Sequence, residues 1–389
     1  DAIIYHMGNS PAHSAFWESL QSLPGVVVLH DYVLHHLMLW HAVNRRKDVR
    51  RYRREMAERY GAAGEAVAVQ MERGQLTDAV FDFPLVEGVI QQATGLIGHS
   101  RYVVDRAQTV RPGLRAAVVP MGVPLPPTPD RAAARSALGL PAEAPIWASF
   151  GHINPYKRVE QALRAFARFR QDYPDARYLL VGSVSANYDV RSLVQRLGLS
   201  EAVQITGYVP AADFGQYVAA ADLCFNGRYP SAGETSASLL RLLGAGRTVL
   251  VSDIATFSEL PDDVVAHVPL GAAEEGTILA YAQRLAGDTT LRQALERNAR
   301  SYVAREHTLA GAAAGYARFL AELHGWSSPP LTRPILWEVE PAPEAGDTVE
   351  QKAGSVAGSA VGQRAAEIGL LEEDVRLLDR AGERLRSLL

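Results

Sequence analysis

Residues 146–268 alternate short apolar runs with longer stretches in which apolar residues recur at helical spacing. Short apolar runs that end at turn residues are typical of buried strands, and the stretches between them are typical of crossover helices. This alternation predicts a parallel sheet with ligands at the carboxyl ends of its strands. The predicted strands are 146–150, 178–181, 203–205, 223–225, 248–251 and 265–268. The predicted helices are 159–173, 190–197, 212–220, 237–245 and 277–285.

The first part of the chain repeats the same pattern with fewer runs. Apolar runs at 26–29, 95–98 and 117–120 each end at a polar residue or a turn, and the chain opens on a further strand that enters a loop within residues 1–9. A second parallel sheet with crossover helices is therefore predicted before the first. The fold class is α/β, with two Rossmann-like, doubly wound domains that face a cleft.

The domain boundaries follow from composition. Residues 124–130 hold four prolines, which continue neither strand nor helix, so they form a linker between domains at 1–123 and 131–308. A helical pattern continues through 309–326. Residues 327–389 begin with a stretch rich in proline, serine and glutamate and end with leucines at helical spacing. We predict a linker and a helical C-terminal extension there.

Composition excludes several classes of protein. A chain of 389 residues that is 48% hydrophobic can bury two substantial cores. Its formal net charge of −4 does not favour nucleic acid as a partner. Cys224 is the only cysteine, which rules out an intrachain disulfide. No run reaches the roughly 20 apolar residues that cross a bilayer. These features suit a cytoplasmic enzyme.

One predicted strand ends in a loop that carries two adjacent cations. In the segment Phe150-Gly-His-Ile-Asn-Pro-Tyr-Lys157-Arg158, the strand stops at Gly151 and the loop leads into a helix. Cations at a helix start oppose the helix dipole, so a bound anion explains Lys157 and Arg158 better than solvent does. Fixed cations and helix N-terminal amides stabilise a leaving phosphate. The segment therefore predicts a phosphate site.

A second strand ends where a carboxylate precedes a helix. The segment Tyr229-Pro-Ser-Ala-Gly-Glu234-Thr-Ser236 follows the strand at 223–225. An acidic residue favours a helix start even without a ligand, so Glu234 alone is a weak signal. Beside a phosphate site, its carboxylate can accept hydrogen bonds from sugar hydroxyls. Backbone amides near Thr235 and Ser236 would add donors to the phosphate. Together the two segments predict a pocket for a phosphorylated sugar.

The spacing of these segments resembles the donor-binding half of retaining glycosyltransferases with the GT-B fold, the family-4 type, also called glycosyl transferases group 1. In that family one strand ends in a loop that begins with Gly-Arg and ends with Lys-Gly, and a later strand ends in Pro-Ser-x-x-Glu-Gly-Phe-Gly. Gly151, Lys157 and Glu234 match this pattern. His152 stands at the family's Arg position and Arg158 at its second Gly.

The family also has a second Glu, eight residues after the first, that binds the nucleotide ribose. Counting back from Ala245-Gly246 places Arg241 at this position, with one residue fewer between the two anchors than in the family, so the resemblance implies a changed nucleotide contact there. The family's other nucleotide contacts correspond to two short segments after strands. These are Gly182, Ser183, Tyr208 and Val209.

The resemblance covers about Asp1 to Trp326 and implies an activity. It implies a retaining, metal-independent hexosyltransferase whose donor is a nucleoside-diphosphate sugar and which needs no cofactor. The acceptor would be a cell-surface polysaccharide or a glycolipid precursor at the cytoplasmic side. In the family the helix at 309–326 crosses back to the first domain. The opening strands and glycine-rich loop of that domain have no counterpart here, so we expect its sheet to be truncated.

Histidines gather in the first domain. His30 precedes Asp31 at a strand end, where it should face the cleft and hydrogen-bond the transferred sugar or orient the acceptor hydroxyl; burial in the core is the alternative. The spacing of His30, His35, His36 and His41 does not place a pair one helical turn apart as in His-Glu-x-x-His. We therefore predict no metal site.

A basic segment follows these histidines. Seven cations lie between Arg45 and Arg54, directly after the apolar residues 36–43. A solvated helix is the simpler interpretation. The pairing of a basic face with tryptophan and leucine also suits docking on anionic lipid headgroups, which would make the protein peripheral to the inner membrane face.

Two other classes of protein compete with the transferase. Ser100 follows a strand in Gly98-His-Ser-Arg-Tyr102, as the nucleophile of a serine hydrolase would, but Tyr102 stands where close packing requires glycine. A non-catalytic partner or nucleotide-sugar-binding protein with the same fold is the second alternative. The changes at His152 and Arg241 favour it.

Overall fold

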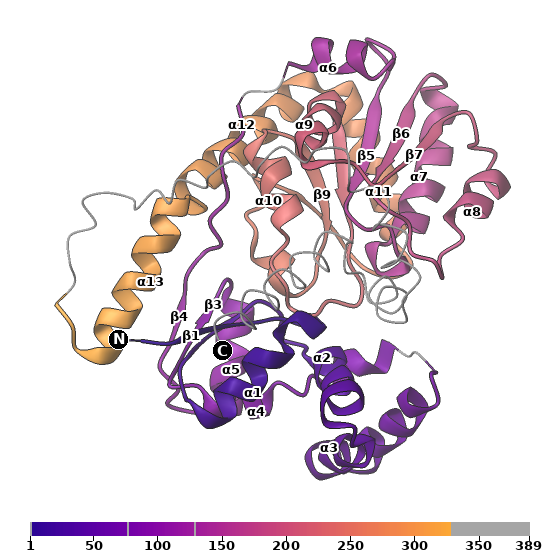
Figure 1. Cartoon of the computed structure of the whole chain (residues 1–389). Coiled ribbons are helices and arrows are strands. Elements are labelled where there is room, and N and C mark those ends of the chain that lie inside the picture. The colour runs from indigo at the N-terminus through magenta and orange to yellow at the C-terminus, as the bar shows by residue number, and fades with distance from the viewer. Residues whose placement is uncertain (1, 76–77, 128–129, 328–389) are drawn as a thin grey trace, which may run out of the picture.

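The computed structural model describes residues 2–75, 78–127 and 130–327, so the linker and extension predicted at 327–389 lie outside it from residue 328 onward. The described chain forms two parallel sheets, each with its own hydrophobic core (Figure 1). None of its helices is long and apolar enough to cross a membrane. The two sheets belong to a two-domain, Rossmann-like α/β fold.

The N-terminal sheet has the strand order β1-β2-β3-β4. Its strands are β1 (Ile4–Met7), β2 (Val26–Leu29), β3 (Gly95–Gly98) and β4 (Ala116–Val118). Each strand is added on the same side of the previous one, so right-handed crossovers place the connecting helices on one face. The predicted run at 117–120 ends earlier, at Val118, and Pro120 has no N–H to donate to a ladder.

Helices cover both faces of this sheet. The crossover segments are η1 (Pro11–His13), α1 (Ser14–Ser22), α2 (His35–Trp40), the π-helix η2 (His41–Arg46), α3 (Val49–Glu72), η3 (Asp78–Asp82), α4 (Glu87–Gln92) and α5 (Arg101–Val110). The opposite face is covered by α13 (Leu309–His324), which returns from the end of the second domain (Figure 1). Phe319 of α13 packs against Val28 and Ile97.

The C-terminal sheet has the order β10-β9-β8-β5-β6-β7. Its strands are β5 (Ile146–Phe150), β6 (Arg177–Val181), β7 (Val203–Gly207), β8 (Leu223–Asn226), β9 (Thr248–Ser252) and β10 (Ala266–Val268). The central strand β5 pairs with β6 on one side and β8 on the other, so the crossovers run in both directions. The order reverses between β5 and β8, and ligands of doubly wound sheets bind at such a switch point.

Within residues 130–306, seven α-helices and two short 3-10 helices surround the second sheet. They are α6 (Arg131–Ala137), η4 (Pro155–Lys157), α7 (Val159–Asp172), α8 (Val190–Arg196), α9 (Ala211–Ala220), α10 (Ala237–Gly244), η5 (Ala255–Glu259), α11 (Glu274–Gly287) and α12 (Thr289–Glu306). The predicted helix 277–285 starts three residues earlier, at Glu274. An acidic residue at that end favours the helix dipole.

Two polar contacts join the domains beside the cleft. The carbonyl oxygen of Ala232 accepts hydrogen bonds from the backbone N–H groups of Tyr32 and Val33, at 2.7 and 2.9 Å. The Glu259 carboxylate accepts from the backbone N–H groups of Arg101 and Tyr102 at the start of α5. A carboxylate at a helix N-terminus satisfies otherwise unpaired donors. These contacts hold the carboxyl ends of the two sheets toward each other.

Candidate functional site

Lys157 lies in the loop after the central strand β5. The side chain of Asn154 accepts a hydrogen bond from the Lys157 N–H at 3.2 Å and shapes the turn. The Lys157 Nζ donates to the carbonyl oxygen of Phe150 at 3.3 Å, so the side chain folds back over the strand end. Gly151 has φ +90, and a Cβ there would lie 3.4 Å from Nζ. Burial, with Arg228 adding to it, holds the pKa of Lys157 well below its usual value.

Arg228 and Glu234 come from the loop after β8, the neighbour of β5. The Nε of Arg228 lies 2.8 Å from Oε1 of Glu234 in a largely buried ion pair. Ser231 donates its hydroxyl to Oε2 of the same carboxylate at 2.9 Å. Arg228 and Glu234 both act electrostatically on Lys157, so the three charges form one cluster at the switch point. Sequence reasoning missed Arg228, although it follows its strand as Lys157 follows β5.

Arg158 makes a contact that the sequence did not predict. Its guanidinium binds Glu274 through two nitrogens, with Nε 3.0 Å from Oε1, and its Cζ lies 5.8 Å from the centre of the Tyr229 ring. Glu274 is only 1% exposed, at the start of α11. A buried carboxylate needs such a partner. The cation that the sequence assigned to phosphate is therefore engaged in an ion pair that fixes α11 to the loop.

The expected nucleotide contacts at the ends of β5 and β6 lie together. His152 Nδ1 is 2.9 Å from the hydroxyl of Ser183. Gly182 has φ +145, and any Cβ there would overlap the carbonyl oxygen of Gly151. Only glycine lets these two strand ends approach so closely. The structure thus brings Gly151, His152, Gly182 and Ser183 to one edge.

The other expected contacts spread along the same domain. Tyr208 is 51% exposed after β7, and Val209 packs against the core under β5. Arg241 lies on α10 with its guanidinium 5.9 Å from the Phe214 ring centre, and within the described residues it forms no ion pair. The predicted Arg241 contact to the nucleotide stays untested.

Thr235 and Ser236 line a cavity of about 310 Å3 between the domains. The hydroxyl of Ser236 accepts a hydrogen bond from the Leu239 N–H at 3.3 Å, so it caps α10. His99, from the N-terminal domain, and His307, which directly follows α12, line the same cavity. The amides at the start of α10 therefore face the space between the domains.

The N-terminal sheet presents a chain of histidines at its carboxyl edge. His99 Nδ1 lies 2.9 Å from the carbonyl oxygen of Val119, so it carries the proton and its Nε2 accepts. The Nδ1 of His30 lies 3.2 Å from that Nε2 and therefore donates. His6 Nδ1 lies 2.9 Å from His30 Nε2 and donates in turn. Burial lowers the pKa of His30 to about 3 and also lowers the pKa values of His6 and His99, which favours the neutral form of all three rings at pH 7.

Asp31 follows His30 and faces the charged cluster of the other domain. Its Oδ2 accepts a hydrogen bond from the Asn9 N–H at 2.7 Å. Burial, and then the nearby carboxylate of Glu234, raises the pKa of Asp31 to about 7. The prediction that His30 and Asp31 lie at the cleft edge agrees with this geometry.

A comparison with known families decides the class of the second domain. Residues 130–301 match the family described as glycosyl transferases group 1. This part of the chain is a group 1 glycosyltransferase domain. The charged cluster of Lys157, Arg228 and Glu234 lies inside the matched residues.

Curated relatives of the group 1 domain are glycosyltransferases by name. D-inositol 3-phosphate glycosyltransferase of Nocardia farcinica is 30% identical over 207 residues, 50% of this chain and 45% of the relative. The same enzyme of Kineococcus radiotolerans is 34% identical over 121 residues, 28% of each chain. Alpha-D-kanosaminyltransferase of Streptomyces kanamyceticus is 24% identical over 183 residues, 47% of this chain and 46% of the relative. The chain spans less than half the length of each of these relatives.

Solved structures agree on the fold. Sucrose-phosphate synthase from Thermosynechococcus elongatus aligns with a TM-score of 0.62 at 18% identity, over 83% of this chain and 74% of that one. Anabaena Alr3699/HepE in complex with UDP and glucose aligns with a TM-score of 0.56 at 16% identity, over 83% and 100%. These similarities place the group 1 domain and its N-terminal partner in the GT-B fold.

The remaining histidines have separate partners outside the group 1 domain. His35 Nε2 lies 2.6 Å from the Tyr52 hydroxyl, His36 Nδ1 lies 3.0 Å from the Asn9 amide, and His41 Nδ1 lies 2.8 Å from the Ser14 hydroxyl. Among the described residues, no group of three histidines, cysteines or carboxylates could hold a metal ion.

The hydrolase alternative finds no catalytic constellation around Ser100. Its hydroxyl accepts a hydrogen bond from the Val103 N–H at 3.4 Å and caps α5. His99 beside it uses both ring nitrogens, toward Val119 and His30. A nucleophilic serine needs a histidine within hydrogen-bond reach, and no described residue supplies one.

The basic segment is less amphipathic than its sequence indicates. Of the apolar residues before it, Leu37 is fully buried and Met38 and Ala42 are nearly so, because α2 packs into the N-terminal core. Val43 is exposed at 39%. Most of the apolar surface that the sequence offered to a membrane is therefore used inside the protein.

Proposed function

We propose that the protein is a retaining glycosyltransferase that takes its sugar from a nucleoside-diphosphate sugar. The observation that carries the proposal is the cluster of Lys157, Arg228 and Glu234 at the switch point of the group 1 domain. Two cations and one carboxylate at this edge suit a diphosphate joined to a sugar. The names of the curated relatives support a glycosyl transfer.

In this proposal Lys157 stabilises the charge that develops on the leaving diphosphate. Its depressed pKa results from burial beside Arg228, and a bound anion would favour the charged ammonium form. Arg228 holds Glu234, whose carboxylate accepts hydrogen bonds from hydroxyls of the donor sugar. The phosphate contact in this proposal is thus Lys157, while Arg228 holds Glu234 beside it and Arg158 supports the loop.

The transfer proceeds on one face of the sugar. The bond between the anomeric carbon and the phosphate oxygen breaks, and the acceptor oxygen forms its bond from the same side. The departing phosphate oxygen takes the acceptor's proton, so no side-chain nucleophile, metal or cofactor is needed. His30 then contributes as a neutral hydrogen-bonding group for the sugar or the acceptor hydroxyl.

The acceptor we propose is a cell-surface polysaccharide or a glycolipid precursor, reached at the cytoplasmic side. This choice rests on the resemblance to family-4 transferases. Peripheral membrane docking through residues 45–54 is part of the same proposal, although the burial of Leu37 and Met38 leaves it little apolar surface.

A thermal-shift screen of UDP, GDP, ADP and their sugars tests the proposal. A ligand at 100 times its dissociation constant stabilises by about 2.7 kcal/mol, which raises the melting temperature by several degrees. One nucleotide series should do so in the full chain. Addition of EDTA should leave donor turnover unchanged. Binding without any turnover would favour the nucleotide-sugar-binding alternative, and no shift with any nucleotide would contradict the proposal.

A further inference from the structure

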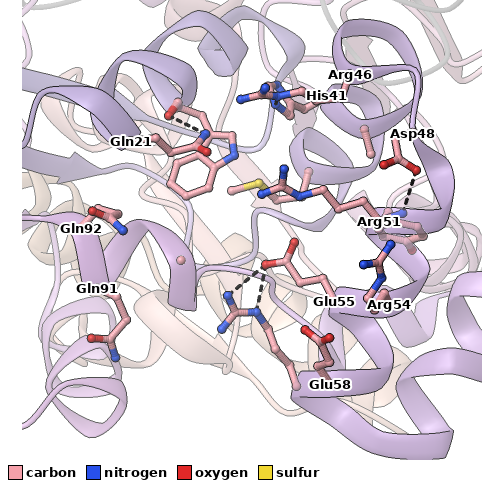
Figure 2. A pocket seen from close by; sticks show the side chains of 16 residues that line it. Gln21, His41, Arg46, Asp48, Arg51, Arg54, Glu55, Glu58, Gln91 and Gln92 are labelled. Carbon is pink, nitrogen blue, oxygen red and sulfur yellow. Dashed lines mark hydrogen bonds and ion pairs between the residues drawn. The ribbon is translucent and has the colours of Figure 1, made fainter.

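A cavity of about 850 Å3 opens on the N-terminal domain, enclosed by α1, α2, η2, α3 and α4 (Figure 2). None of its lining residues belongs to the loops around Lys157 and Glu234. Gln91 and Gln92 of its wall end α4, just before β3 begins, so they lie toward the amino ends of the strands. The cleft lies at the carboxyl ends. The cavity is therefore a separate site.

One end of the cavity is basic and partly fixed. Arg46 Nε donates to His41 Nε2 at 3.3 Å, and His41 Nδ1 lies 2.8 Å from the Ser14 hydroxyl. A histidine that accepts at Nε2 carries its proton on Nδ1, so this chain orients Arg46 through a buried neutral ring. Both residues belong to the π-helix η2, and such irregular turns are frequent at functional sites.

Two arginines that line the cavity have no acidic partner. Among the described residues neither Arg51 nor Arg54 forms an ion pair, and Arg51 extends into the middle of the cavity (Figure 2). Arg45 and Arg53 of the same segment do not line it, and they are paired with glutamates at 2.8 and 2.7 Å. Asp48, Glu55 and Glu58 also line the cavity, and Glu55 is paired with Arg59 at 3.0 Å. Arg51 and Arg54 are exposed, and their guanidinium groups can bind an anion.

The opposite wall combines an aromatic ring with amides. Trp17 of α1 is half-buried and lies against Gly88 of α4, where a Cβ would come within 3.1 Å of the indole. Gln91 and Gln92 stand across the opening from Arg54 (Figure 2). A ring face with a few placed polar groups is the usual lining of a site for a small polar organic ligand.

We propose that this cavity binds a phosphorylated sugar, separately from the donor site. The phosphate is held by Arg46, Arg51 and Arg54, and the sugar ring lies against Trp17 with its hydroxyls toward the glutamines. The guanidinium fork matches phosphate oxygens in two parallel hydrogen bonds. The volume lies within the range of roughly 300 to 1,000 Å3 that small-molecule sites occupy.

Calorimetry on the full chain tests this site, with glucose 6-phosphate and glucose 1-phosphate as probes and with the donor site saturated with UDP or left empty. At least one probe should bind more tightly than inorganic phosphate or glucose. The double variant Arg51→Gln/Arg54→Gln should weaken it by about tenfold or more. Arg50→Gln, an exposed arginine of α3 outside the cavity, is the matched control and should bind as the parent does. Lys157→Ala, which tests the donor site, should also leave this affinity unchanged.

Three results would overturn the proposal. The first is no binding of either probe by a parent protein that shows its normal circular dichroism. The second is equal affinity in the double variant. The third is sedimentation with phosphatidylglycerol vesicles that the double variant abolishes and that 10 mM glucose 6-phosphate does not compete with, because the arginines would then serve a lipid surface. Trp17→Phe keeps an aromatic ring in place and should retain only part of the affinity for the sugar phosphate. A site that bound the phosphate alone would retain its full affinity in this variant.

Discussion

The carboxyl edges of the two sheets face the same cleft but have opposite chemistry. In the C-terminal domain the edge carries charges: Lys157, Arg228 and Glu234 lie within one electrostatic cluster. In the N-terminal domain the edge carries a neutral chain of histidines, and Asp31 next to it has its pKa raised to about 7. Both domains have parallel sheets, so the difference comes from the residues at the strand ends and in the loops that follow them.

This contrast suggests that the two edges bind different parts of the substrates. A charged edge with helix N-termini compensates the charge on a leaving diphosphate, while a neutral edge offers hydrogen bonds to sugar and acceptor hydroxyls without attracting a second anion. Substitutions in the loops on either side of the cleft should therefore have different effects on stability, on its pH dependence and on donor turnover.

Arg158→Ala should lower the free energy of unfolding by about 4 kcal/mol, because it leaves the buried carboxylate of Glu274 without a partner. Urea denaturation measures this change. Arg164→Ala on α7, the helix that follows Arg158, is the control: its ion pair with Glu160 is exposed, so its loss should cost less than about 1 kcal/mol. A variant Arg158→Ala that keeps its stability but loses nucleoside diphosphate binding would return Arg158 to the phosphate site.

Asp31→Asn should change how stability depends on pH. The pKa of Asp31 is raised in the folded protein, so the folded state holds a proton that the unfolded state releases above pH 4. This contribution to stability is full at pH 4 and is lost as the pH rises through 7. As the pH rises over that range, the free energy of unfolding of the variant should therefore increase relative to that of the parent, by on the order of 3 kcal/mol at pH 8. Asp105→Asn, on the exposed side of α5, should show no such trend in urea unfolding.

Parallel pH profiles of Asp31→Asn and the parent would contradict this account. They would mean that Asp31 is ionised at the cleft edge, and the N-terminal edge would then not be neutral.

Glu234→Gln should impair the handling of the donor sugar without impairing the binding of the diphosphate. The amide keeps the shape but is a weaker acceptor for sugar hydroxyls, so donor hydrolysis should slow by about tenfold. The affinity for free nucleoside diphosphate should change little. Release of diphosphate from the donor and calorimetry measure the two quantities. An equal loss in both would place Glu234 at the phosphate instead.

Local patterns in the sequence located much of this site. The alternation of apolar runs predicted the six strands of the second sheet, and the loops after two of them contained Lys157 and Glu234. The positive charge of the loop at Lys157 and the position of the Glu234 carboxylate before a helix can be read directly from the sequence.

What the sequence did not show depends on distant partners. Arg158 is held by Glu274, which is 116 residues away along the chain, and His30 is held by His99, 69 residues away. Neither pairing has a spacing signal, because each depends on which loops the parallel sheet brings together. Arg228 was missed for a related reason. Its role arises from an ion pair across a loop, and only its place after a strand could have indicated it.

The central claim is that Lys157 and its neighbours bind the diphosphate of the donor. Calorimetric titration of the full chain with the nucleoside diphosphate that the thermal-shift screen selects tests this most directly, with Lys157→Met as the variant and Arg164→Ala as the control. The methionine keeps the apolar stem and removes the charge. We expect the affinity to fall by about tenfold or more in Lys157→Met and to be unchanged in the control. Equal affinity in all three proteins would contradict the account.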